Sequence, residues 1–286
     1  MIGFITNSNS SQEIITQAIE AKTVINQDRA HPSRSDRYSL VKTADLISMF
    51  EAEGFRWKLV AQERSRKASY KGFGTHMIRL ESPEIVSGDS LIDNEIKPVL
   101  YLRNSYHGRS RLRLDLGFFR FACMNGLFVG QSLKSFNKKH IGMDQEYIKG
   151  VFSEMKEAFK GAVPVIRSLM EKEISLDEQL NMAKAILTER LHLQQNVVEA
   201  EYSKLLTINR PEDSGNSVWK VMNRIQENLG LNFNSVPVEM TYTVEVLDKD
   251  NQIQQKERRV RRLSGISEIT RLNKLLFDLA VNAAKS

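Results

Sequence analysis

The sequence predicts an α+β protein: an antiparallel β-meander with one basic face is backed by helices and followed by a mostly helical half with a β-hairpin. Three observations support this fold. Apolar and basic residues alternate along several segments of the first half, as on strands that bury one face. Apolar residues recur at helical spacing through much of the second half. Near the C-terminus, segments 240–246 and 253–263 flank a turn typical of a hairpin.

Each element follows from a local pattern. Leu40, Ala44, Ile47 and Phe50 recur at helical spacing, and Gly54 is suited to ending that helix at residue 53. Alternation predicts strands at 56–63, 75–81 and 97–104, and another that begins at residue 109 and runs on through 118–129. The remaining helices are predicted at 144–172, 176–206, 217–229 and 267–284, and Pro164 is expected to kink or break the first of these.

These elements suggest four parts along the chain. Residues 1–38 form an N-terminal arm and connector, and residues 39–142 form the α+β domain with the basic sheet. Residues 143–207 form a long helical segment. Residues 208–286 form a helix–hairpin–helix segment that we expect to pack on the core.

The charge is concentrated in the first half. Residues 1–142 contain 21 lysines and arginines against 14 acidic residues, whereas residues 143–286 contain 20 against 21. The formal net charge is +6 and the pI is near 9.3. An excess of one sign in one half of a chain indicates an anionic partner.

Other features bear on the compartment. No apolar run is long enough to span a membrane, and the N-terminus lacks the pattern of a secretory signal, so no membrane partner is expected. The single cysteine, Cys123, cannot form an internal disulfide and lies in an apolar segment, where a buried role is expected. These features predict a cytoplasmic protein.

Two segments predict a basic sheet face. Arg109, Arg111 and Arg113 alternate with Ser110, Leu112 and Leu114, so on a strand the three arginines share one face. Their spacing, roughly 6.6 Å, is close to that of phosphates along an extended strand. The alternative is a solvated strand whose arginines lie along its surface.

The segment 56–66 repeats the pattern. Arg56, Lys58, Arg64 and Arg66 fall on even positions, whereas the odd positions carry Trp57, Leu59 and Ala61. Aromatic residues lie among the charges, and Phe73, Tyr101 and Tyr106 are candidates to stack on bases. His107 is either a contact to a base or phosphate or a turn residue without chemistry. The candidate nucleic-acid-binding residues are Arg56, Lys58, Arg64, Arg66, Phe73, Tyr101, Arg103, Tyr106, His107, Arg109, Arg111 and Arg113.

Motifs for cofactors and metals are missing. The chain contains neither of the glycine-rich phosphate loops, and no histidine lies in a metal-binding spacing, so we predict no cofactor and no metal. Asp89, Asp93 and Glu95 could hold a divalent ion for a nuclease, with Lys97 nearby. The same Glu-x-Lys triplet recurs at 20–22 and 154–156, so the pattern is not specific and catalysis stays uncertain.

Several segments together are similar to a known group. HPSRSDRY, GFRWKLVAQERSR, THMIRL and FFRFACMNGLFVGQS resemble the phage/plasmid-like proteins of the prophage YfjQ/YafZ type, as do SVWKVMNRIQENL and the C-terminal RRVRRLSGISEITRLNKLLFDLA. The resemblance implies residence on mobile DNA and no established activity. The order of elements also resembles that of Rad52-like single-strand annealing proteins, in topology only.

We therefore expect a nucleic-acid-binding protein of a mobile genetic element that binds single-stranded DNA during phage or plasmid replication or recombination. The alternative is a protein that binds and inhibits or regulates a host protein of defence or replication. Salt distinguishes the two, because phosphate binding weakens steeply as salt rises. Self-association is expected too, since several subunits in a row track an extended strand better than one.

Overall fold

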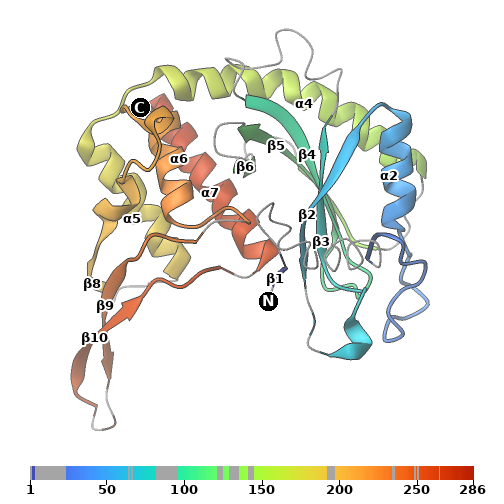
Figure 1. Ribbon diagram of the computed structural model, residues 1–286, viewed down its shortest axis with the longest axis horizontal. Coiled ribbons are helices and arrows are strands. Elements are labelled where there is room, and N and C mark those ends of the chain that lie inside the picture. The colour runs from blue at the N-terminus through green and yellow to red at the C-terminus, as the bar shows by residue number, and fades with distance from the viewer. Residues whose placement is uncertain are drawn as a thin grey trace, which may run out of the picture. The chain divides into compact units, whose positions relative to one another are not determined.

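The protein is described here by a computed structural model of mixed α and β structure, which confirms the predicted fold class (Figure 1). It divides into two compact units, one of Met1–Val163 with Ser264–Ser267 and the other of Pro164–Leu263 with Glu268–Ser286. The structure describes residues 2–3, 24–63, 65, 67–81, 96–120, 125–128, 135–140, 145–191, 197–233, 236–247, 249, 251–263 and 265–286.

The first unit is built on an antiparallel sheet of seven strands. Strands β1 to β6 pair in chain order, and β7 pairs with β5. The strands are β1 (Ile2–Gly3), β2 (Arg56–Glu63), β3 (His76–Glu81), β4 (Ile96–Asn104), β5 (Leu112–Arg120), β6 (Asn125–Phe128) and β7 (Ser135–Lys138). A meander of this kind follows from the alternating pattern, because each strand buries only one face.

One face of this sheet is apolar. Residues paired across antiparallel strands lie on the same face, so Ile78, Leu102 and Leu114 form one buried row. Helix α2 (Thr43–Ala52) lies beside the sheet, with Leu46, Ile47 and Phe50 buried (Figure 1). The amphipathic pattern of the helix thus provides the partner that the apolar row requires.

At one end of this face lies a buried polar network. Thr43 Oγ1 is 2.7 Å from His76 Nε2 and accepts from Asn104 Nδ2 at 2.9 Å. His76 Nδ1 lies 3.1 Å from the Gly74 carbonyl, so Nδ1 carries the proton and Nε2 accepts from the threonine hydroxyl. Tyr106 stacks on His76 and its hydroxyl accepts from the Thr43 amide at 2.8 Å. The network fixes the start of α2 against β3 and β4.

The other face of the sheet is charged. Lys58, Arg79, Tyr101 and Asp115 occupy neighbouring positions on four strands. A second row pairs Arg103 with Arg113. Basic residues thus share this sheet face with Asp115, and Arg79, Arg103 and Asp115 are at most 9% exposed.

The second unit contains most of the helices and a small sheet. Within it, α6 buries Trp219, Met222 and Ile225, and α7 buries Leu272 and Leu276. The three strands pair in the order β10–β9–β8. Its elements are α5 (Leu176–Leu191), β8 (Val197–Ala200), the 3-10 helices Tyr202–Leu206 and Pro211–Asp213, α6 (Val218–Asn228), β9 (Thr241–Leu247), β10 (Ile253–Arg259) and most of α7 (Ile266–Lys285), while α4 (Gln145–Glu171) runs from the first unit into the second.

Three sequence-based expectations differ from the structure. The helix predicted at 176–206 ends at Leu191. Val197 belongs instead to strand β8 and pairs with Val244 of β9. Of the two outcomes predicted at Pro164, a kink or a break, the break does not occur, because helix α4 continues through this residue. Strand β5 begins at Leu112 rather than at residue 109. Within the described residues, no helix combines the length and apolar character needed to cross a membrane.

Candidate anion-binding pocket

A pocket of about 340 Å³ lies in the first unit between three segments that are distant in sequence. Five of its lining side chains are cationic, and none of the lining residues is a carboxylate. The lining consists of Arg34, Ser35, Arg37, Tyr38, Gly108, Arg109, Ser110, Arg111, Lys139 and His140. A concave site with this charge favours an anionic ligand.

The first segment, 31–38, is folded into turns. The Arg34 amide donates to the His31 carbonyl and the Tyr38 amide to the Ser35 carbonyl, both at 2.9 Å. The His31 amide donates to the Tyr106 carbonyl at 2.9 Å, which anchors the segment to the loop after β4. The proline, serines and aspartate of this stretch favour turns, and they leave Arg34 and Arg37 exposed at the pocket.

Tyr38 connects all three segments. Its hydroxyl donates to the Ser105 carbonyl at 2.7 Å, and its ring stacks on His140 with centroids 4.9 Å apart. Burial raises the pKa of the Tyr38 hydroxyl, with the nearby Tyr106 acting in the same direction and Arg34 against it. The phenol therefore stays protonated at neutral pH and keeps its hydrogen bond.

The second segment is the loop 105–111 between β4 and β5. Ser105 Oγ donates to the Ser110 carbonyl at 3.0 Å and accepts from the Ser110 amide at 3.3 Å, which closes the loop at its base. Gly108 has φ of 68°, in the left-handed region that glycine adopts readily. A Cβ there would lie 3.1 Å from Arg34 Cδ and 3.3 Å from Tyr38 Cε2, so glycine also permits the loop to approach the first segment.

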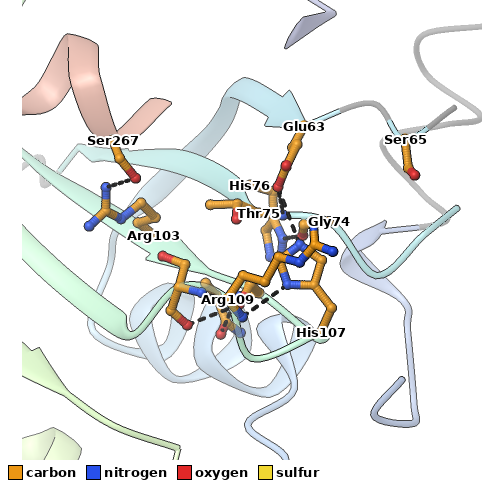
Figure 2. Close-up of polar contacts among 12 residues, drawn as sticks. Glu63, Ser65, Gly74, Thr75, His76, Arg103, His107, Arg109 and Ser267 are labelled. Atoms are coloured by element: carbon orange, nitrogen blue, oxygen red, sulfur yellow. Dashed lines mark hydrogen bonds and ion pairs between the residues drawn. The ribbon is translucent and has the colours of Figure 1, made fainter. Parts of the chain in front are cut away.

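A buried histidine supports this loop. The Arg109 amide donates to His107 Nδ1 at 3.1 Å, so the proton lies on Nε2, which is 3.3 Å from Glu63 Oε2 (Figure 2). The hydrogen bond from His107 is the main cause that lowers the pKa of Glu63 to about 2, assisted by bonds from Thr75. Glu63 and His107 therefore act as positioning residues for Arg109.

Stacked rings position the Arg109 side chain as well. Its guanidinium carbon lies 5.1 Å from the centroid of the Tyr70 ring, within the range of a cation–π contact. The Tyr70 ring in turn stacks on His31 with centroids 4.1 Å apart. Arg109 is exposed yet held from both its backbone and its side chain.

The third segment is Lys139 and His140, directly after β7. Lys139 is exposed, whereas His140 is only 4% exposed. Neither ring nitrogen of His140 has a hydrogen-bond partner of ordinary geometry among the described residues. Burial lowers the pKa of His140 to about 4, although weak hydrogen bonds to the backbone of Ser110 and Ser39 act in the opposite direction. At neutral pH the imidazole is therefore uncharged and has one N–H to donate.

The chemistry of this arrangement is binding of an anion through guanidinium and ammonium groups. Planar guanidiniums match the oxygens of a phosphate, and lysine adds a point charge. In the part of the chain that the structure describes, no group of three or more His, Cys, Asp or Glu side chains is placed to hold a metal ion.

The structure brings together only some of the residues predicted from sequence. Arg109 and Arg111 line the pocket, but they do so from the loop before β5 and not from a strand. Arg113 lies on β5, half-buried, beside the buried Arg103. Arg103 also donates to Ser267 Oγ, a residue of the same unit, at 3.2 Å (Figure 2).

The remaining predicted residues lie elsewhere. Arg56 and Lys58 are exposed on β2, whereas Arg64, Arg66 and Cys123 lie outside the described residues. The rings proposed to stack on bases are buried: Phe73 is 7%, Tyr101 2% and Tyr106 0% exposed. They pack in the protein here, and stacking on a base would require them to become exposed.

Sequence reasoning missed Arg34, Arg37, Tyr38, Lys139 and His140 as functional residues. A signal for the first three was present, because HPSRSDRY places two arginines among turn-forming residues. Lys139 and His140 carried no such signal, since their place depends on the pairing of β7.

Comparisons with known proteins place most of the chain in one family. Residues 30–263 match the family described as "Domain of unknown function (DUF932)". The chain is 29% identical to UPF0380 protein YfjQ and to UPF0380 protein YafZ of Escherichia coli (strain K12), each over 214 residues that cover 72% of both chains. No solved structure matches the chain.

Proposed function

We propose that this chain, which belongs to the DUF932 family, binds single-stranded DNA in the replication or recombination of a mobile genetic element. The single observation that carries the proposal is the pocket lined by five cationic side chains and no carboxylate. The mobile-element setting rests on the resemblance to the phage/plasmid-like proteins.

Phosphate is the ligand group that this pocket suits best. Four of the five cations are arginines, which bind phosphate oxygens through two parallel N–H groups. The Arg109 amide donates to His107, and the Arg109 guanidinium lies over the Tyr70 ring. Part of the conformational entropy of Arg109 is therefore already lost on folding, which lowers the entropic cost of binding a ligand. Around the pocket, residues 101–142 contain eight lysines and arginines and one acidic residue, Asp115.

A single strand suits the site better than a duplex. The cations line a recess formed by loops, and a flexible strand can bend a phosphate into a recess. Readers of duplex DNA instead insert a helix or a two-stranded ribbon into a groove. Exposed Arg56 and Lys58 on β2 would extend the positive surface of the same unit.

Fluorescence anisotropy with labelled single- and double-stranded oligonucleotides, across a salt series, tests this proposal. Each phosphate neutralised on a single strand contributes about −0.7 to the slope of log K against log salt. Replacing Arg109 and Arg111 by alanine should therefore make the slope shallower by about 1.4 and weaken binding at low salt. The matched control replaces Arg167 and Lys184, two exposed residues of the helices α4 and α5, and should leave the slope unchanged.

Two results would reject the proposal. One is no binding of either oligonucleotide at low salt. The other is an equal loss in the pocket variant and in the control, because the loss would then reflect net charge and not the pocket. If the duplex binds more tightly than the single strand, double-stranded DNA is the ligand and the single-strand part of the proposal is wrong.

A further inference from the structure

We infer that the pocket seats a terminal phosphate of the strand, a phosphate monoester with two negative charges, in preference to an internal phosphodiester. This inference rests on the proposed function and names the part of the ligand that the pocket recognises. The shared chemistry is that of any phosphate monoester, so a free nucleotide or inorganic phosphate is the other possible source.

The first argument is charge. Five cations line one pocket of about 340 Å³, and no carboxylate among the lining residues offsets them. An internal phosphodiester carries one negative charge, whereas a monoester carries close to two at pH 7, because its second pKa is about 6. A dense cluster of cations discriminates in favour of the ligand with the higher charge.

The second argument is the concave shape of the pocket. The lining comes from three segments, and the loop carrying Gly108 approaches Arg34 so closely that a Cβ would lie 3.1 Å from its Cδ. An internal phosphate needs room for the strand to leave on both sides. A terminal phosphate leaves on one side only, so a recess of this kind can take it while the rest of the strand stays outside.

The third argument is His140. It lines the pocket and is 4% exposed, and its ring nitrogens approach the backbone of Ser39 and Ser110 without forming a hydrogen bond of ordinary geometry. Buried polar groups almost always have a partner of good geometry, so a ligand in the pocket could complete the weakly bonded imidazole. An oxygen of a terminal phosphate would accept from the imidazole N–H. Tyr38, stacked on this ring and bonded to Ser105, would hold the imidazole in place.

Oligonucleotides of one sequence that carry a 5′-phosphate, a 3′-phosphate or hydroxyls at both ends test the inference, each with a label at the opposite end or within the strand. We expect the full chain to bind one of the two phosphorylated strands about tenfold more tightly than the hydroxyl strand, the change that one more charge-assisted hydrogen bond gives. Inorganic phosphate should compete with every strand for the pocket and, at saturation, should abolish this preference.

Two variants assign the preference to the pocket. Arg34→Ala removes an exposed side chain, so the protein should stay folded, and the preference should fall to about twofold or less. His140→Gln keeps a neutral side chain that can donate a hydrogen bond but changes its reach, and it should reduce the preference with less effect on the hydroxyl strand. The Arg167 and Lys184 double variant is the control and should keep the full preference.

Each remaining outcome is decisive. Equal binding of all three strands overturns the inference and leaves the proposed function intact. No binding of any strand overturns the proposed function. If inorganic phosphate or adenosine monophosphate then raises the melting temperature of the wild type but not of Arg34→Ala, a free monoester is the ligand. If neither inorganic phosphate nor adenosine monophosphate changes the melting temperature, both the inference and the proposed function are wrong.

Discussion

Thr43→Val should destabilise the first unit, because the Thr43 hydroxyl connects two buried polar groups. It donates to His76 Nε2 and accepts from Asn104 Nδ2, and Thr43, His76 and Asn104 are all 0% exposed. Valine has nearly the same shape, so the substitution creates no cavity and removes only the hydrogen bonds.

The magnitude follows from the groups left unpaired. The substitution leaves one acceptor on His76 and one N–H on Asn104 without a partner, since the other N–H of Asn104 donates to the Val41 carbonyl. An unpaired buried polar group costs roughly 1–3 kcal/mol, so we expect the free energy of unfolding to fall by about 3 kcal/mol. That is a large share of the roughly 5–15 kcal/mol that stabilises a domain.

Urea unfolding followed by tryptophan fluorescence measures this change in one unit alone. The chain has two tryptophans, Trp57 in the first unit and Trp219 in the second. In a Trp219→Phe background the signal comes from Trp57, whose Nε1 donates to Glu51 of α2 at 3.0 Å. Thr43→Ser retains the hydroxyl and is the control. A Thr43→Val transition within about 0.5 kcal/mol of the parent, at an unchanged slope, would refute the reasoning.

Three other predictions follow from the same unit. Burial lowers the pKa of His76 and of His140 to about 4, so the unfolded chain takes up protons first, and stability should fall as the pH falls from about 6.5 to 4; a urea midpoint that is flat over this range contradicts it. Glu63→Gln should loosen the loop that carries Arg109 and weaken oligonucleotide binding several-fold by anisotropy, whereas an unchanged affinity would show that the loop holds without the carboxylate. Gly108→Ala should cost about 1 kcal/mol in the urea assay, because alanine is strained at φ of 68°, and it should also reduce the phosphate preference; a stability equal to wild type argues against that strain.

The strands were predictable where one period held over most of a segment. Strand β2 spans the predicted residues 56–63, since basic and apolar residues alternate along it up to a register shift between Leu59 and Ala61 and α2 lies beside it. The same alternation misled at β5. Arg109 and Arg111 continue the parity of Arg113, but the bonds between Ser105 and Ser110 turn this stretch into a loop. Periodicity predicts which face of a strand a side chain would occupy, but it does not predict hydrogen bonds that turn the chain into a loop.

The pocket could be predicted only in part, because no local pattern brings its three segments together. The arginines at 109 and 111 were visible as a basic cluster, and those at 34 and 37 as part of a distinctive motif. Their meeting depends on the turn at Gly108 and on the hydrogen bond from the Tyr38 hydroxyl to Ser105. Such long-range contacts are set by tertiary structure, which composition and spacing do not encode.

The shortness of β7 has a dynamic consequence for the pocket. Lys139 and His140 are placed by only four pairings with β5, of which Leu112 with Lys138 is the last. Short strands open at lower free energy than the sheet to which they belong, so amide hydrogens of β7 should exchange sooner than those of β4. A bound anion stabilises only the closed arrangement and should slow this exchange according to its concentration and Kd. Exchange rates in β7 would then measure occupancy of the pocket without any label on the ligand.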